Sequence, residues 1–456
     1  MVGSLVTVGA VSRAPNVAVV GGGIAGLAAA LRLRDRAPSG TTITVYEQSG
    51  SVGGKLSTGS AAGSAVEQGA EAFLLRDADG GDSAAVALAR RVGLGDALVH
   101  PAVGQAALAL HGTLAPMPGG TLLGVPADLE KVAAVARPDA ERDRDGGRPL
   151  LGPEEDVTVG ALVRRRLGDE VVDRLVDPLL GGVYAGRADG LSLVATMPGL
   201  ARAARVEHTL TGAVRAAMAA APRPAGGPVF ATVAGGVSRL AAAVAEASGA
   251  EIRLGTPVRE LARVPGGWRV GPDTVDAVVL ALPARRAARL LGVEPLLDYA
   301  SVALVTLALP APELPTLSGF LVPAGEGTLV KAATFFSTKW AHLRRDDGVA
   351  LVRASVGRYG EEHQLHTGDP ELVRTVHTEL STLIGARLPE PVDARVRRWG
   401  GALPQYPVGH VERVAALRAT LPPTVALAGA GYDGVGIPIC VRSGETAADE
   451  VLKGLS

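Results

Sequence analysis

The chain has 456 residues, a formal net charge of −1 and a single cysteine, Cys440. This length allows a large core divided among two or three domains. The balanced charge gives no sign of a nucleic-acid surface, and one cysteine excludes an internal disulfide framework and suits a reducing cytoplasm. No apolar run reaches about 18 residues, so we expect no transmembrane segment. The apolar stretch 4–11 has no basic residue ahead of it, and we expect no signal peptide there.

The first strong pattern is a strand, a glycine turn and a helix at 16–34. The valine-rich run 16–20 predicts a buried parallel strand, and apolar residues recur at helical spacing after residue 23. Between them, G-x-G-x-x-G would permit a tight turn, the approach of a pyrophosphate and close packing of helix on strand. The anion would bind free N–H groups at the helix N-terminus. The motif comprises Gly21, Gly22, Gly23, Ile24, Ala25 and Gly26. A glycine turn without a ligand is the less favoured alternative.

A carboxylate and a lysine follow this turn at positions that favour FAD. A second strand, predicted at 41–46, ends in Glu47, which can accept the ribose hydroxyls of a dinucleotide. Soon after it, the paired glycines of 51–56 let the backbone pass close to a ligand, and Lys55 can face a phosphate or a flavin. An ordinary turn with a solvated lysine is the alternative. Because dehydrogenases that bind only NAD have no need of this element, its position favours FAD.

The middle of the chain, 82–220, has a predominantly helical pattern. An apolar stripe at 171–180, with charged residues opposite, predicts an amphipathic helix. GGVYAG follows at 181–186, where Tyr184 between glycines can mark a tight turn. Three arginines at 164–166 could bind an anion, but a solvated helix face is the preferred interpretation.

Strand and glycine-turn patterns return in the second half. A strand and a turn at 230–239 lead into a helix, and 276–283 predicts another strand of the dinucleotide-binding fold. Residues 291–393 alternate as in an antiparallel sheet. The closing element, 424–442, is a buried strand with a glycine-rich turn, and a helix is expected from Ser443 to Leu452.

These patterns predict an α/β protein with a two-dinucleotide-binding, Rossmann-like FAD domain, an inserted mixed-sheet substrate domain and a helical domain. We expect a discontinuous FAD domain formed by 16–80, 228–290 and 392–456. The helical domain is expected at 81–227 and the substrate-binding sheet domain at 291–391. Because pockets form at domain interfaces, the substrate should lie where the three domains meet, in front of the flavin.

Six short motifs, in this order along the chain, resemble those of the FAD-dependent porphyrinogen oxidases of haem biosynthesis. The resemblance is greatest to the bacterial, water-soluble coproporphyrinogen III oxidases, which are relatives of the protoporphyrinogen oxidases. The first two motifs belong to all amine-oxidase-like flavoproteins, whereas the longer later ones are specific as a set. They are GGGIAG at 21–26, VGGK at 52–55, PLLGGVYAG at 178–186, LS at 191–192, PQYPVGH at 404–410 and GVGIPIC at 434–440.

The resemblance implies non-covalent FAD and a set of residues around it. Besides 21–26, the residues that would hold the ADP half and the pyrophosphate are Glu47, Gln48 and Lys55. Those implied around the flavin are Gly69, Ala70, Glu71, Ala72, Trp399, Val435, Gly436 and Ile437, and Val258 would meet the adenine side through its backbone. Candidate cations for substrate propionates are Arg76, Lys331, Lys339 and Arg353, and Tyr184 is a further candidate substrate contact.

The resemblance also implies the reaction, a six-electron oxidation of coproporphyrinogen III to coproporphyrin III. Dioxygen would be the acceptor and hydrogen peroxide a product, with a transient contact to the next haem-pathway enzyme. The cofactor carries such redox chemistry, and we predict no metal site and no catalytic side chain. For His410 a structural hydrogen bond is preferred to proton transfer. The alternatives are a protoporphyrinogen IX oxidase, another amine-oxidase-like flavoenzyme, and a flavin-binding protein that delivers or senses porphyrin.

Overall fold

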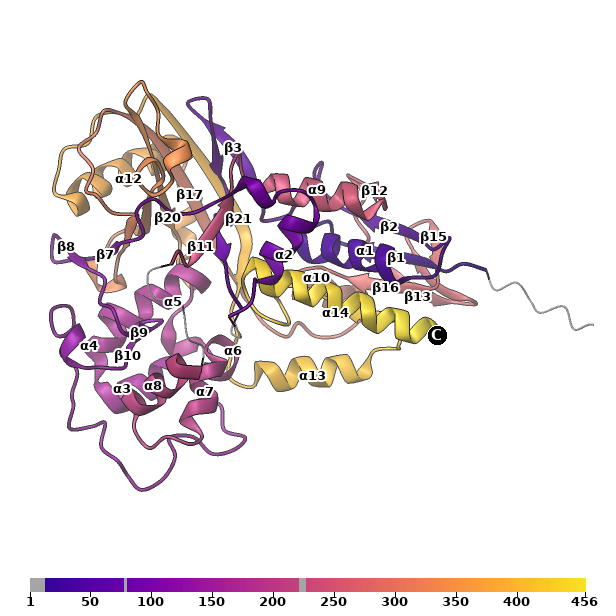
Figure 1. Cartoon of the computed structure of the whole chain (residues 1–456), viewed down its shortest axis with the longest axis horizontal. Helices are drawn as coiled ribbons and strands as arrows, with labels where there is room; N and C mark the ends of the chain where they lie inside the picture. The colour runs from indigo at the N-terminus through magenta and orange to yellow at the C-terminus, as the bar shows by residue number, and fades with distance from the viewer. Residues whose placement is uncertain (1–12, 78–79, 221–226) are drawn as a thin grey trace, which may run out of the picture.

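The structure, a computed structural model, describes residues 13–77, 80–220 and 227–456. The stretch 4–11, where no signal peptide is expected, lies outside these residues. The described chain forms three lobes, which we name after their main elements: a parallel-sheet lobe, a mixed-sheet lobe and a helical lobe (Figure 1). Among the described residues, no helix is long and apolar enough to cross a membrane.

The parallel-sheet lobe is built on five parallel strands in the order β12-β2-β1-β16-β22. Helices α1 and α14 cover one face and an antiparallel meander, β13–β15, covers the other. This confirms the predicted α/β fold. The elements are β1 (Asn16–Val20), α1 (Ile24–Arg36), β2 (Thr42–Tyr46), α2 (Ala84–Arg91), α9 (Ser238–Ser248), β12 (Glu251–Arg253), β13 (Leu261–Val264), β14 (Gly267–Val270), β15 (Asp273–Val275), β16 (Ala277–Leu280), α10 (Ala284–Leu291), α13 (His410–Thr420), β22 (Val425–Leu427) and α14 (Ile437–Leu455).

Two expectations for this lobe are wrong. The strand β11 (Phe230–Val233) does not join the parallel sheet, because it pairs antiparallel with β5 (Phe73–Leu74) and β6 (Leu98–Val99). Helix α14 begins at Ile437 and not at Ser443. Its proline lies in the first helical turn, where a missing N–H breaks no helical hydrogen bond.

The mixed-sheet lobe contains seven strands in the order β21-β17-β20-β19-β18-β7-β8. Helix α12 packs on one face of this sheet. The elements are β7 (Ala106–Leu110), β8 (Thr113–Pro116), β17 (Tyr299–Pro310), β18 (Gly319–Leu321), β19 (Val330–Phe335), α11 (Phe336–Lys339), β20 (Val349–Val356), α12 (Asp369–Ile384) and β21 (Asp393–Pro404). A hairpin of β3 (Thr58–Ala61) and β4 (Ser64–Glu67) lies near β17 and β21.

The composition of this sheet corrects the expected boundaries at three strands. Strands β7 and β8 come from 81–227, which was expected to be helical, and β21 comes from 392–456, which was assigned to the FAD domain. A short apolar run such as that of β7 does not reveal by its periodicity whether it is a buried strand or part of a helix. Its pairing partner, β18, lies some two hundred residues further along the chain.

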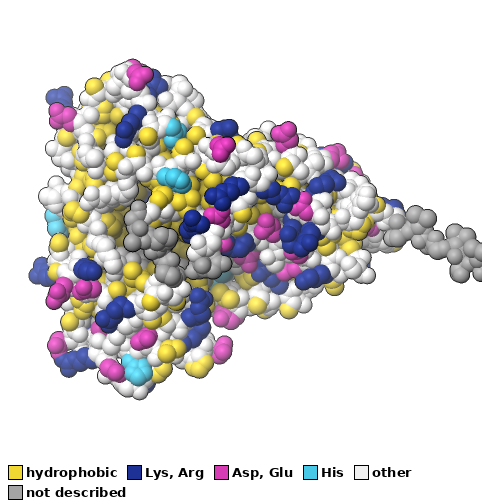
Figure 2. All heavy atoms as spheres, viewed as in Figure 1, with side chains coloured by type: hydrophobic (Ala, Val, Ile, Leu, Met, Phe, Trp, Pro, Cys, Tyr) yellow, Lys and Arg dark blue, Asp and Glu magenta, His cyan; other side chains and the backbone are white. Residues whose placement is uncertain are grey.

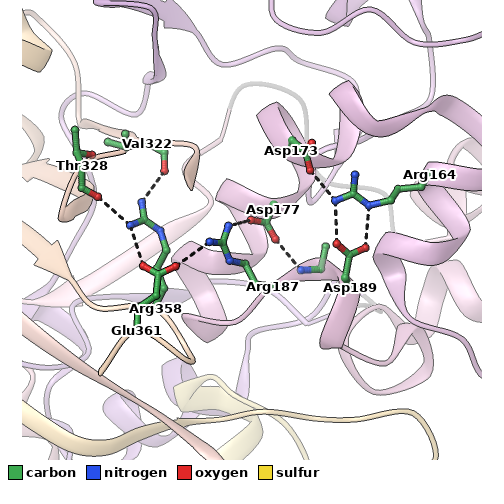
Figure 3. Close-up of polar contacts among 10 residues, drawn as sticks. Arg164, Asp173, Asp177, Arg187, Asp189, Val322, Thr328, Arg358 and Glu361 are labelled. Carbon is green, nitrogen blue, oxygen red and sulfur yellow. Dashed lines mark hydrogen bonds and ion pairs between the residues drawn. The ribbon is translucent and has the colours of Figure 1, made fainter. Parts of the chain in front are cut away.

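In the helical lobe, the helix formed by the apolar stripe at 171–180 extends further than expected. The helix α5 runs through GGVY, and the left-handed turn comes only at Ala185, with φ 53°. Arg164 is half-buried and paired with Asp173 and Asp189 (Figure 3). Arg166 is half-buried and paired with Asp143, so the expected solvated helix face is correct only for Arg165, which is exposed. The elements are β9 (Thr121–Leu122), β10 (Val125–Pro126), α3 (Val159–Leu167), α4 (Asp169–Val171), the π-helical η3 (Val172–Val176), α5 (Asp177–Tyr184), α6 (Leu193–Thr196), α7 (Pro198–Ala204) and α8 (Leu210–Ala220).

Candidate functional site

The glycine turn between β1 and α1 forms an open cradle. Gly21 has a φ of +110°, and a Cβ built on it would lie 2.3 Å from the Ala281 carbonyl oxygen. A Cβ on Gly26 would lie 1.9 Å from the Gly21 carbonyl oxygen, so this glycine lets helix and strand touch. A Cβ on Gly23 would instead meet nothing within 4 Å. Gly23 therefore faces open space at the N-terminus of α1, which has no side-chain cap.

The carboxylate of Glu47 lies against this cradle from the end of β2. Its Oε2 accepts a hydrogen bond from the Gly22 N–H at 2.8 Å, and its Oε1 accepts from the Ser49 N–H at 2.8 Å. The Thr256 N–H donates to the Glu47 carbonyl at 2.8 Å, which brings the segment that carries Val258 to the same edge of the sheet. Gln48, which follows, is exposed.

Three backbone segments run side by side from the cradle toward the mixed-sheet lobe. The Gly53 N–H donates to the Gly22 carbonyl at 2.8 Å, and the Ala70 N–H donates to the Lys55 carbonyl at 2.9 Å. A Cβ on Gly69 would lie 2.1 Å from that same Lys55 oxygen. The predicted segments around Gly23, Lys55 and Gly69 are therefore in contact in the fold.

Lys55 has a side chain without a hydrogen-bond or ion-pair partner among the described residues, and burial lowers its pKa. A largely desolvated ammonium of this kind is stabilised by a bound anion.

A second helix, α14, also begins after a glycine turn. The turn before α14 passes through Gly434 and Gly436 with φ angles of +128° and +126°, and α14 has no side-chain cap. A Cβ on Gly444 would lie 2.0 Å from the Ala25 carbonyl oxygen, so α14 and α1 are in backbone contact. Because helix N-termini attract anions, the N-terminus of α1, the open glycine cradle and a lysine that has no ion-pair partner among the described residues are a donor set that fits the pyrophosphate of FAD.

The segment Gly69–Ala72 is attached to the mixed-sheet lobe by a buried ion cluster. The carboxylate of Glu71 accepts from Lys339 Nζ at 2.7 Å, from Arg353 Nη2 at 2.5 Å and from Trp340 Nε1 at 2.9 Å. Burial opposes the ionisation of Glu71, but the two cations outweigh it and hold its pKa at about 2.

Trp399, on β21, lies against the same segment. Its indole Nε1 donates to the Gln68 carbonyl at 2.5 Å, and its ring lies 3.5 Å from the Cβ position of Gly69. The segment thus passes between the Lys55 loop and the tryptophan.

The candidate substrate cations differ in their partners. Arg76 is exposed and paired with Asp82 at 2.9 Å, whereas Lys339 and Arg353 are both paired with Glu71. Lys331 is 7% exposed and donates only to the Gly181 carbonyl, at 3.3 Å. Burial, together with Arg358, lowers its pKa to about 7. Among the described residues, Lys331 alone of these four has no carboxylate partner.

The face of the mixed sheet opposite α12 is incompletely covered. Ala332, Thr334 and Ser355 lie on interior strands of this sheet and are nevertheless half-buried. Val183, on α5, is 38% exposed. Hydrophobic side chains gather in a hollow where the three lobes meet (Figure 2). This face of the sheet is therefore only partly packed against other described residues.

An aromatic cluster joins α5 to the segment that follows β21. The ring of Tyr184 is buried and lies 5.7 Å from that of Tyr406, which in turn stacks on His410 at 4.7 Å. Burial raises the pKa of Tyr184 to about 12 and lowers that of His410 to about 4. Neither ring nitrogen of His410 has a hydrogen-bond partner among the described residues, so the expected structural hydrogen bond is wrong and the ring acts by stacking.

Gln405 is a structural residue that the sequence interpretation missed. Its Nε2 donates to the Tyr184 carbonyl at 2.7 Å, and its Oε1 would lie 2.0 Å from a Cβ on Gly186. A side chain at Gly186, the last glycine of GGVYAG, would therefore collide with Gln405 of PQYPVGH. The presence of both motifs was the available signal, but their contact depends on the tertiary fold.

Comparison with known proteins gives a consistent assignment. The family model "Flavin containing amine oxidoreductase" matches residues 24–452. The chain is 39% identical to coproporphyrinogen III oxidase of Mycobacterium tuberculosis, covering 96% of this chain and 97% of the relative. It is 30% identical to the enzyme of the same name from Bacillus subtilis, covering 96% and 98%.

A solved structure agrees with these relatives. The putative protoporphyrinogen oxidase from Exiguobacterium sp. 255-15 superposes with a TM-score of 0.83 at 31% identity, covering 96% of this chain and 99% of that one. FAD is the cofactor of this fold, and the donor set described above fits it. The chain therefore belongs to the flavin-containing amine oxidoreductases, within their group of coproporphyrinogen III and protoporphyrinogen oxidases.

Proposed function

We propose that this oxidoreductase converts coproporphyrinogen III to coproporphyrin III in haem biosynthesis, with dioxygen as electron acceptor and hydrogen peroxide as product. The observation that carries the proposal is the near full-length similarity to enzymes named coproporphyrinogen III oxidase. It is supported by the convergence of the group-specific motifs, since Gln405 contacts Tyr184 and the Tyr406 hydroxyl donates to the Ala430 carbonyl.

The proposed roles of the protein groups are binding and orientation. Bound FAD supplies the hydride-accepting chemistry. The N–H groups of Gly23 and of the first turn of α1, with Lys55, bind the pyrophosphate, and Glu47 binds the ribose hydroxyls. Gln48 and the backbone near Val258 lie toward the adenine. Gly69–Ala72, Trp399 and the turn Val435–Ile437 enclose the flavin.

Lys331 is the best candidate for a substrate carboxylate. Lys331 is a buried residue of β19 that reaches the Gly181 carbonyl of α5, and the charge of Arg358 acts on it. Arg358 is 8% exposed and donates to the Thr328 and Val322 carbonyls at 3.1 and 3.4 Å (Figure 3). The carbonyl of Gly181 lies near the C-terminus of α5, and the negative end of this helix partly offsets the charge of the Lys331 ammonium. A substrate carboxylate would pair with the ammonium directly. One charge-assisted hydrogen bond contributes roughly 1.5–3 kcal/mol, about 10- to 150-fold in affinity.

Four propionates distinguish coproporphyrinogen III from protoporphyrinogen IX, which has two propionates and two vinyl groups. If Lys331 binds a propionate that only the first substrate carries, it favours that substrate. If the propionate is shared, Lys331 assists both equally. Of the other candidate contacts, Arg353 is paired with Glu71, and the ring of Tyr184 packs against that of Tyr406.

The deciding experiment follows porphyrin fluorescence under air with each porphyrinogen and measures kcat/KM, with hydrogen peroxide assayed in parallel. We expect a preference for coproporphyrinogen III, and a drop of about 10- to 150-fold for Lys331→Met. The control is Lys453→Met, an exposed lysine of α14. A preference for protoporphyrinogen would overturn the substrate but not the oxidase. Flavin bleaching by amines alone would indicate a different amine-oxidase-like enzyme, and flavin without turnover a carrier.

A further inference from the structure

The buried cluster around Glu71 has more positive charge than its carboxylate requires. Glu71 pairs with Lys339 at 2.7 Å and with Arg353 at 2.5 Å, so two cations face one carboxylate. The exposed fractions of the three side chains are 10% for Glu71, 19% for Lys339 and 11% for Arg353. Because buried charges are weakly screened by solvent and salt, the surplus positive charge acts on its surroundings.

The cluster also fixes the segment that we place beside the flavin. Arg353, on β20, donates not only to Glu71 but also to the Glu67 carbonyl at 3.0 Å. Trp340, the residue that follows α11, donates to Oε1 of Glu71, whereas Arg353 donates to Oε2. The segment 67–71 is therefore held from two elements of the mixed-sheet lobe, while the hydrogen bond from Ala70 to Lys55 holds it to the cofactor cradle.

A second carboxyl, that of Glu67, lies close to this segment. The carboxyl of Glu67 accepts from the Val237 N–H at 2.8 Å and from Thr58 Oγ1 at 3.0 Å. Burial raises its pKa to about 7, so it is incompletely ionised at neutral pH and does not fully cancel the surplus. Both cations also contact aromatic rings, since Arg353 lies over the Phe336 ring at 4.8 Å and Lys339 over the Trp340 ring at 5.2 Å.

We propose that Glu71, Arg353 and Lys339 set the reduction potential of the bound FAD. Reduction by a hydride adds negative charge to the flavin, and the two cations stabilise that charge while Glu71 limits their effect. The three are positioning and electrostatic residues, and none is required to contact the substrate. The inference rests on the proposed placement of the flavin along 69–72, and it does not depend on which porphyrinogen is oxidised.

The test is the midpoint potential of the purified holoprotein, measured by coupled reduction with a reference dye. Glu71→Gln removes a negative charge, and we expect the potential to rise. Arg353→Gln and Lys339→Gln each remove a positive charge, and we expect it to fall. A cluster that serves only to hold the segment would respond to any of these losses by loosening, without shifts of opposite sign. Arg269→Gln, in an exposed pair with Glu260, is the control and should leave the potential unchanged.

Unchanged potentials, or shifts of the same sign in all three variants, would overturn the proposal. If Arg353→Gln loses flavin because its backbone contacts are gone, Lys339→Gln decides, since the Lys339 amine donates only to Glu71 among the described residues. Shifts in the expected directions in a protein that oxidises neither porphyrinogen would overturn the proposed substrate and leave this role intact.

Discussion

Replacement of Gly23 by valine should separate folding from cofactor binding. Gly23 has φ −72° and ψ 173°, an extended conformation that valine adopts readily. A Cβ at this position meets nothing within 4 Å, so the ligand-free variant should fold with nearly unchanged stability. The same side chain would occupy the open space at the N-terminus of α1, where the pyrophosphate is expected to bind.

The magnitude follows from the hydrogen bonds that the side chain would block. Two charge-assisted hydrogen bonds from N–H groups of the turn are worth roughly 3–6 kcal/mol together. Their loss would weaken FAD binding by a factor on the order of 10² to 10⁴. A matched variant, Gly26→Val, introduces a Cβ at 1.9 Å from the Gly21 oxygen, and we expect it to destabilise the fold itself.

The flavin-free proteins are titrated with FAD, and binding is monitored by the quenching of flavin fluorescence. Urea unfolding of the same samples measures their stability. Gly23→Val should unfold at the wild-type midpoint and bind FAD weakly, and Gly26→Val should unfold at lower urea. Wild-type affinity for FAD in Gly23→Val would refute the position of the pyrophosphate. A large loss of stability in Gly23→Val would refute the argument that the cradle is open.

Three further predictions concern other contacts. Gly444→Ala, which places a Cβ 2.0 Å from the Ala25 oxygen, should lower the free energy of unfolding by about 1–3 kcal/mol in urea melts. Glu47→Gln should weaken FAD binding about 10-fold in the fluorescence titration. The NH2 group of the glutamine cannot accept the hydrogen bond from the Ser49 N–H, so the side chain would no longer be held in position to bind the ribose. Unchanged affinity would contradict this prediction. Burial lowers the pKa of His410 from 6.5 to about 4, so between these pH values the unfolded chain binds a proton that the folded chain does not. The free energy of unfolding should therefore fall by roughly 3 kcal/mol as the pH is lowered from 6.5 to 4. His410→Phe should retain the stacking and lose this pH dependence in urea melts.

The sequence by itself determined the elements that depend on short-range geometry. The glycines at 21–26 require a backbone that turns tightly and approaches a helix closely, and such demands are visible in the residue types. The strand ending in Glu47 and the paired glycines before Lys55 follow this turn at short spacing. Most of the proposed cofactor site could therefore be predicted from the sequence alone. The antiparallel strands of 291–391 were visible in the same way, through their alternation.

Only the tertiary structure decided which charges are free and which are paired. Glu71 lies more than 260 residues before both Lys339 and Arg353 in the sequence, and no local pattern reveals that one carboxylate holds both cations. The assignment of β7 to the mixed sheet has the same cause, because its partner strand is distant along the chain. Desolvation and ion pairing depend on which segments meet, so the separation of Lys331 from the other candidate cations followed from the fold and not from the spacing of residues.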